Sequence, residues 1–155
     1  MKADENRMRS IRHSVQENST IVERIVQNIV MKYSQELDEE VEKIRELLSD
    51  SETLSDAEIE HIVMRLPVFM YFGVNGLENL GIESDMAKAV KMEVFNEKYI
   101  QAEGTIQDKT HQAELDTLNE QMVEVAFSRA YRQLKAKIEK AEHVFSGAKK
   151  VLTKR

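Results

Sequence analysis

The chain has 155 residues, of which 41% are apolar and 32% charged, with 5 glycines, 1 proline and no cysteine. Few helix-breaking residues and many charges favour long amphipathic helices over a sheet protein, and the lack of thiolates excludes disulfides and cysteine-ligated zinc. The net charge of -6 conceals an asymmetry, because residues 1–86 carry 9 basic and 18 acidic side chains whereas residues 87–155 carry 13 and 10.

Neither a membrane span nor a secretion signal is visible. The longest apolar run, residues 66–74, is about half of the ~20 residues that a spanning helix needs. The first residues lack the apolar segment of a signal peptide. We therefore expect a cytoplasmic protein without membrane contact.

The first predicted elements are a basic arm and a long acidic helix. Residues 1–17 are polar, with Arg7, Arg9 and Arg12 clustered, and are expected to form a mobile arm or a frayed helix start. A helix of residues 18–50 should then begin at Asn18 or Ser19, either of which can cap it. Its apolar stripe has the helical period: Val22, Val26, Val30, Tyr33, Leu37, Val41, Ile44 and Leu48.

Acidic side chains dominate the second half of this helix: Glu36, Asp38, Glu39, Glu40, Glu42 and Glu46. They lie mostly off the apolar stripe, so a solvated face is the favoured interpretation. The alternative is an acidic contact for a basic partner or for the chain's own carboxyl-terminal helix.

The next helix should start at Ser55, which forms a capping-box pattern with Glu58. Pro67 is expected to kink or restart it, and the apolar run around it to form the buried centre. The aromatic residues Phe69, Tyr71 and Phe72 could stack on bases, but their apolar neighbours favour a core position.

A third helix is predicted after Ser84, ending at Gly104, and a fourth from Thr105–Asp108 to Phe145 or beyond. The fourth helix carries an unbroken heptad seam with steps of 4 and 3 residues. That seam comprises Phe127, Tyr131, Leu134, Ile138, Ala141, Phe145, Ala148 and Leu152. Its six larger members, Phe127, Tyr131, Leu134, Ile138, Phe145 and Leu152, are our candidates for oligomerisation.

The expected fold is therefore all-α, with long helices in a helical bundle and coiled-coil-like amino- and carboxyl-terminal helices. We divide the chain into an arm (1–17), an acidic helix (18–50) and a helical bundle (51–155) that ends in the basic heptad helix.

Signs of catalysis are missing. No phosphate-binding glycine motif and no nucleophile elbow occurs, so we expect no enzyme and no cofactor. Glu58 with His61, and Asp108 with His111, place a carboxylate and an imidazole one helical turn apart, as di-iron bundles do. Such pairs arise often by chance in a highly charged helix, so solvated surface is favoured over a metal site.

The last 28 residues carry 9 basic and 2 acidic side chains. Outward cations on a helix neutralise phosphates without reading sequence. Our candidate nucleic-acid-binding residues are Arg129, Arg132, Lys135, Lys137, Lys140, Lys149 and Lys150. The alternatives are a solvated helix that balances the acidic helix and a surface for an acidic protein; membrane-surface binding is disfavoured by the narrow seam.

One resemblance adds to this reading. Ala87–Lys88 through Glu93, Tyr99, Gly104 and Lys109, followed by an amphipathic helix ending at residues 148–155 (AKKVLTKR), resemble the UvsY-type recombination mediators of phages. The resemblance covers about residues 86–155 and is one of pattern. It implies a cytoplasmic homo-oligomer that binds single-stranded DNA and helps to load a recombinase where single-strand-binding protein sits.

Our leading hypothesis is a non-enzymatic, oligomeric accessory protein that binds single-stranded nucleic acid in phage recombination or replication. The alternative is a protein–protein adaptor, or an inhibitor of a host factor, that acts through the acidic helix or the carboxyl-terminal seam.

Overall fold

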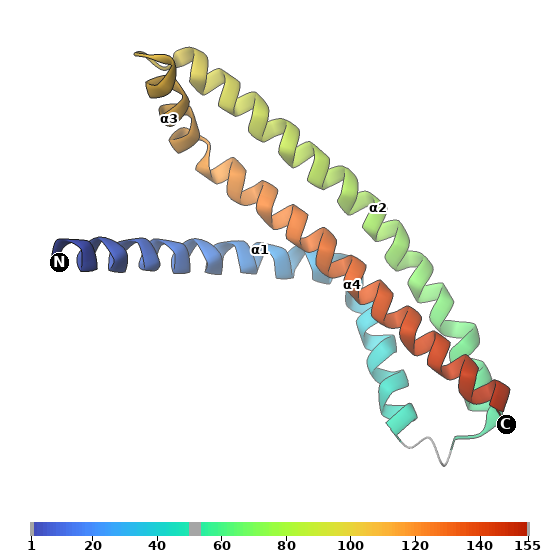
Figure 1. Cartoon of the computed structure of the whole chain (residues 1–155). Helices are drawn as coiled ribbons and strands as arrows, with labels where there is room; N and C mark the ends of the chain where they lie inside the picture. The colour runs from blue at the N-terminus through green and yellow to red at the C-terminus, as the bar shows by residue number, and fades with distance from the viewer. Residues whose placement is uncertain (1, 50–53, 155) are drawn as a thin grey trace. The chain divides into compact units, whose positions relative to one another are not determined.

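The computed structural model describes residues 2–49 and 54–154, and within them it contains helices and turns but no strand. In chain order the helices are α1 (Lys2–Ser49), α2 (Asp56–Gln101), α3 (Ile106–Asp116) and α4 (Leu118–Lys154) (Figure 1). The all-α fold is thus as expected. None of the described helices is both long and apolar enough to cross a bilayer.

Helix α1 begins at Lys2, so the expected helix start at Asn18 or Ser19 is wrong. No glycine or proline interrupts residues 2–49, so the helix that is packed from Val26 onward can propagate into the polar stretch at one hydrogen bond per residue. Side chains 5–21 are nevertheless all exposed. The expected apolar stripe is confirmed further along, where Val26, Val30, Leu37 and Ile44 are buried. Part of the predicted helix end, residues 50–53, lies outside the described residues.

Helix α2 is continuous through Pro67 and through the expected restart after Ser84, so the prediction of two helices here is wrong. The glycines that we took as punctuation instead allow close packing. A Cβ at Gly73 would lie 3.3 Å from Cγ1 of Ile138, and one at Gly76 would lie 3.0 Å from Cδ1 of Tyr33. Packing against other helices therefore outweighs the intrinsic helix penalty of glycine, which is about 1 kcal/mol.

The buried side of α2 follows a heptad that includes these glycines. Its fully buried members are Ile59, Ile62, Leu66, Gly73, Gly76 and Leu80. We expected the apolar run 66–74 to form the buried centre as a block, and this prediction is wrong. Successive helical residues turn by about 100°, so the run cannot face one side. Leu66 is buried, whereas Val68, Phe72 and Val74 are half exposed or more.

Two short breaks separate the remaining helices. The expected end at Gly104 and restart at Thr105 are confirmed: Gly104 has φ +109°, and Thr105 and Asp108 form a capping box. The fourth helix is not single, however. Thr117 divides it into α3 and α4, and its hydroxyl donates to the carbonyl oxygen of Ala113 at 2.8 Å.

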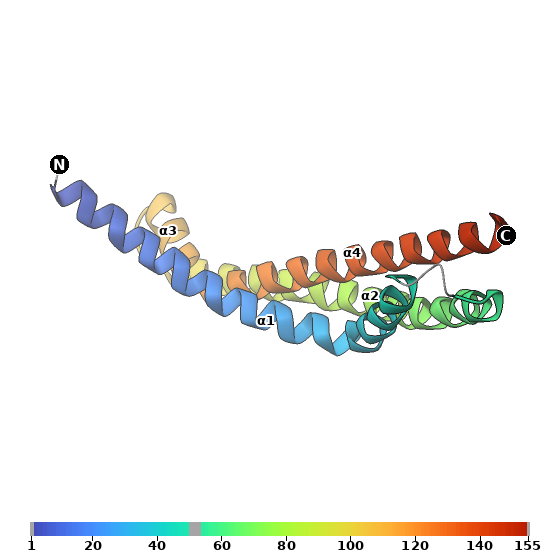
Figure 2. The ribbon, with the colours of Figure 1, turned by 90° about the horizontal axis from the view of Figure 1, so that it is seen from below.

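The described chain forms two compact units, each assembled from segments far apart in sequence. Unit 1 comprises residues 1–29 and 82–129, and unit 2 comprises residues 30–81 and 130–155. In unit 2, α2 and α4 run alongside each other in both views (Figures 1 and 2), and Leu37 of α1 and Ile138 of α4 both lie against Gly73 of α2. Among the described residues, nearly all of the buried apolar side chains belong to unit 2, and only Val26, Ala113 and Ala126 belong to unit 1.

Candidate nucleic-acid interface

The candidate cations lie along the continuous helix α4. Its inner side is anchored in unit 2 by Leu134, Ile138, Ala141 and Ala148, all of which are buried. Six of the seven candidate cations lie in unit 2, and the seventh, Arg129, is the last residue of unit 1. All are exposed except Lys137, which is half-buried.

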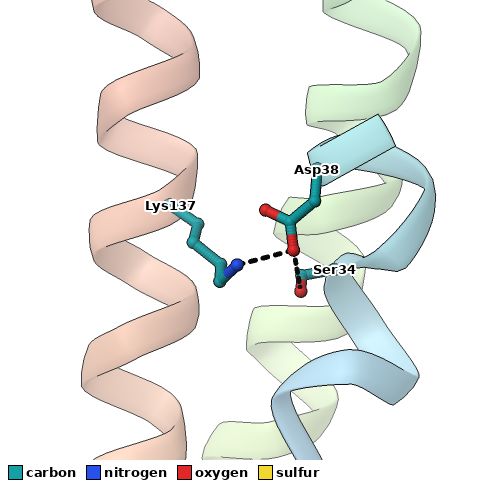
Figure 3. Close-up of polar contacts among 3 residues, drawn as sticks. All are labelled: Ser34, Asp38 and Lys137. Atoms are coloured by element: carbon teal, nitrogen blue, oxygen red, sulfur yellow. Dashed lines mark hydrogen bonds and ion pairs between the residues drawn. The ribbon is translucent and has the colours of Figure 1, made fainter. Parts of the chain in front are cut away.

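Lys137 is paired within the chain. Its Nζ donates to Oδ2 of Asp38 on α1 at 2.5 Å, and the hydroxyl of Ser34 donates to the same oxygen at 2.8 Å (Figure 3). Ser34 is fully buried, so this bond also satisfies its hydroxyl. Lys137 is thus engaged by the acidic helix, as the alternative of an internal charge balance anticipated.

The other cations take two positions on α4. Arg129, Arg132, Lys140 and Lys150 lie on the side opposite Leu134, given 3.6 residues per turn. Lys135 and Lys149 flank the packed side, and Nζ of Lys149 lies 5.6 Å from the ring centroid of Phe145, a cation–π distance. The result is an exposed row of cations along one helix.

The predicted seam of α4 packs within the chain. Ile138 contacts the site of Gly73 on α2, and Cε2 of Tyr131 would lie 3.4 Å from a Cβ at Gly81. Leu134 and Ile138 are buried, whereas Phe127, Tyr131, Phe145 and Leu152 are half-buried. Burial of Leu134 and Ile138 therefore requires no second copy, and oligomerisation through the seam stays a prediction.

The acidic segment of α1 divides into two sets. Glu36, Glu39, Glu42 and Glu46 are exposed, as expected of a solvated face. Glu40 is instead buried, and its Oε2 accepts from the guanidinium of Arg65 on α2 at 3.1 Å. Together with Lys137–Asp38, this pair shows that part of the acidic run stabilises unit 2.

The aromatic residues of α2 are more exposed than we predicted. Tyr71 is 65% exposed and Phe72 57%, and their rings meet edge to face with centroids 6.0 Å apart. Only Phe69 is half-buried, beneath the guanidinium of Arg65. The assignment of Tyr71 and Phe72 to the core is wrong, because Leu66 and Gly73 occupy the inner positions of this helix.

Both carboxylate–histidine pairs use their carboxylates as helix caps. Oε2 of Glu58 accepts from the backbone N–H of Ser55, and Oδ2 of Asp108 accepts from that of Thr105. The hydroxyl of Thr105 also donates to Oδ2 of Asp108, and this bond, followed by the backbone one, lowers the pKa of Asp108 below its ordinary value. The backbone hydrogen bond from Ser55, followed by that from its hydroxyl, lowers the pKa of Glu58 in the same way. Among the described residues, no group of three or more potential ligands could hold a metal ion.

Sequence reasoning missed an apolar groove in unit 1. Ile82, Met86 and Val90 of α2 face Val123 and Phe127 of α4 across a hollow of about 480 Å³. Glu120 also lines it, and its Oε2 is buried without a hydrogen-bond partner in the described chain. The sequence signal for this groove was two sets of residues at helical spacing, residues 82, 86 and 90 on α2 and residues 120, 123 and 127 on α4.

Comparison of the chain with protein-family models, with curated proteins and with solved structures gives no match.

Proposed function

We propose that this chain is a non-enzymatic, oligomeric accessory protein whose helix α4 binds single-stranded nucleic acid. The supporting observation is the row of exposed cations on α4, in which Lys137 is half-buried and pairs with Asp38 and the other six candidate cations are exposed. Such a row contacts phosphates along a strand and gives affinity without sequence preference.

The helix itself favours this role. The buried residues Leu134, Ala141 and Ala148 fix the inner side of α4, so the cations are displayed on a helix that packing holds in place. As the resemblance to phage recombination mediators implies, the setting would be recombination or replication. Its partners would then be a recombinase and single-strand-binding protein.

The test is a titration of labelled single-stranded oligonucleotide at two or more salt concentrations. Binding should appear at low salt and fall steeply as salt rises, because bound cations release counterions from the strand. Replacing Lys135, Lys140 and Lys150 by Gln should reduce the slope of log affinity against log salt by about 2, since each single-strand phosphate contact contributes about 0.7.

A matched control changes Arg24, Lys43 and Lys88 to Gln, which removes the same charge from exposed positions off α4. This variant should keep the wild-type slope. Equal losses in both triple variants would reduce the effect to net charge, and an absence of binding at low salt would refute the proposal.

A second candidate function is a protein–protein adaptor or inhibitor acting through α1. The exposed carboxylates Glu36, Glu39, Glu42 and Glu46 favour it, because they form an anionic surface that a basic partner could bind. Charge reversal at Glu39 and Glu42 should then abolish function, whereas the Lys-to-Gln changes on α4 should leave it intact.

A further inference from the structure

The amino-terminal part of α1 carries an apolar stripe that nothing in the described chain covers. Met8, Ile11 and Val15 follow the 3–4 spacing of a helix seam and are 57%, 50% and 59% exposed. All side chains from 5 to 21 are exposed. This segment therefore gains no burial from its own chain.

The apolar groove between α2 and α4 in unit 1 is a second apolar surface that no helix of the described chain covers. In unit 2, α2 and α4 are packed with a segment of α1, whereas in unit 1 the groove between α2 and α4 is lined by residues of those two helices alone. Ile82, Met86 and Val90 remain about half exposed there. The groove thus lacks the third helix that completes the core in unit 2.

We propose that the α1 segment 7–22 of a second copy occupies this groove. The arrangement is reciprocal, so two copies related by twofold symmetry fill two grooves. It extends the oligomeric part of the proposed function and is independent of nucleic-acid binding.

Charge complementarity supports this occupant. Residues 7–22 of α1 contain Arg7, Arg9 and Arg12 and one acidic residue, Glu17, whereas residues 82–129 contain 10 acidic and 5 basic side chains. Glu120 in the groove has a buried carboxylate oxygen that no described residue pairs with, and such a group is costly unless it is paired. Pairing with an arginine of the incoming helix requires the Glu120 side chain to turn toward the groove surface, where the guanidinium supplies the missing donor.

A second copy fits better than the chain's own α1 segment. Helix α1 runs unbroken from Lys2 to Ser49 and has no glycine or proline at which residues 5–21 could turn back. A coiled coil between two α1 segments would cover the stripe. It would leave the groove empty and the Glu120 carboxylate without a donor. Only stripe-to-groove packing covers both apolar surfaces at once.

Cross-linking tests the arrangement directly, because the natural chain has no cysteine. A Val15→Cys chain and a Val123→Cys chain, one of them enlarged by a tag, are mixed and treated with a short bismaleimide. We expect a mixed cross-linked dimer as the main product. Replacing Val123→Cys by Ala136→Cys, an exposed site of α4 in unit 2, should abolish it.

Other products identify other arrangements. If Val15→Cys cross-links to itself as efficiently as to Val123→Cys, the α1 segments form a coiled coil and the proposal is overturned. A monomeric mass by light scattering at concentrations of about 100 µM, together with no cross-link, also overturns it, since a stable interface of this kind should associate well below that concentration. Neither result would affect the oligonucleotide titration, so failure of one proposal leaves the other standing.

Point variants give an independent readout. Ile11→Asp on the stripe and Met86→Asp in the groove change exposed side chains, so circular dichroism should show that both variants fold. Each should weaken self-association by about tenfold or more, because a charge is forced into an apolar contact at both symmetric sites. A coiled coil of α1 segments predicts loss for Ile11→Asp alone, and an unoccupied groove predicts no change for Met86→Asp; either result contradicts the proposal.

Discussion

Units 1 and 2 contain segments of the same long helices but differ in how completely these bury their apolar faces. Unit 2 buries Leu66, Leu80, Leu134 and Ile138 among segments of three helices. Unit 1 holds most of the exposed large apolar side chains, including Met8, those of the groove and those of α3. Amphipathic patterning thus suffices for a helix, whereas the apolar lining of the α2–α4 groove in unit 1 lacks the third helix that would bury it.

Polar groups follow the same division. In unit 2, Glu40 is matched by Arg65, and Asp38 is matched by Lys137 and Ser34. In unit 1, Lys91 pairs with Glu124, but Glu120 retains a buried oxygen without a hydrogen-bond partner in the described part of the chain. An incomplete apolar surface and an orphaned carboxylate in the same groove are the signature that we expect of a binding surface seen without its occupant.

The largest expected effect separates two leucines of α4. Leu134→Ala in unit 2 should lower the free energy of unfolding by about 2–5 kcal/mol, because a fully buried side chain is lost and a cavity remains. Leu118→Ala in unit 1 should cost no more than about 0.5 kcal/mol, because Leu118 is 51% exposed. Urea unfolding of both variants measures the difference, and equal losses would erase the distinction between the units.

Alanine substitutions at two glycines of unit 2 should have smaller effects on stability, and these two effects should be opposite in sign. Gly76→Ala should destabilise by about 1 kcal/mol net, since its Cβ would lie 3.0–3.3 Å from three Tyr33 atoms, among them a Cβ tied to the backbone. Gly147→Ala should stabilise by about 0.5–1 kcal/mol, because no atom lies within 4 Å and alanine favours a helix. Thermal unfolding measures both, and stabilisation by Gly76→Ala would show that the α1–α2 contact is loose.

The smallest effect concerns pH and the start of α3 in unit 1. The pKa of Asp108 is lowered by hydrogen bonds from Thr105, so its ionised form stabilises the helix start above the ordinary aspartate pKa. This contribution is lost as pH falls through the lowered pKa, in the range below about pH 4.

Cα chemical shifts of residues 106–108, followed by NMR from about pH 6 to pH 3, should report local fraying. Asp108→Asn should abolish the pH response. A response that persists in Asp108→Asn would assign the fraying to another group. Loss of tertiary structure in unit 2 over the same range would show that the effect is not local to α3.

Much of the local structure could be read from the residues. The capping boxes at Ser55 and Thr105, the stop at Gly104 and the α1 stripe around Val30 and Leu37 were predictable, because they depend on neighbours within one or two turns. The row of cations on α4 was also predictable, since its spacing is that of an exposed helix face.

The tertiary structure decided what those local signals could not. Gly73 and Gly76 became close contacts inside a continuous helix because Ile138, Leu37 and Tyr33 pack onto them. Lys137 was bound to Asp38 by a contact across 99 residues of sequence. The groove of unit 1 exists because α2 and α4 meet there without a third helix, and only the arrangement of helices in space determines which apolar stripes find a partner.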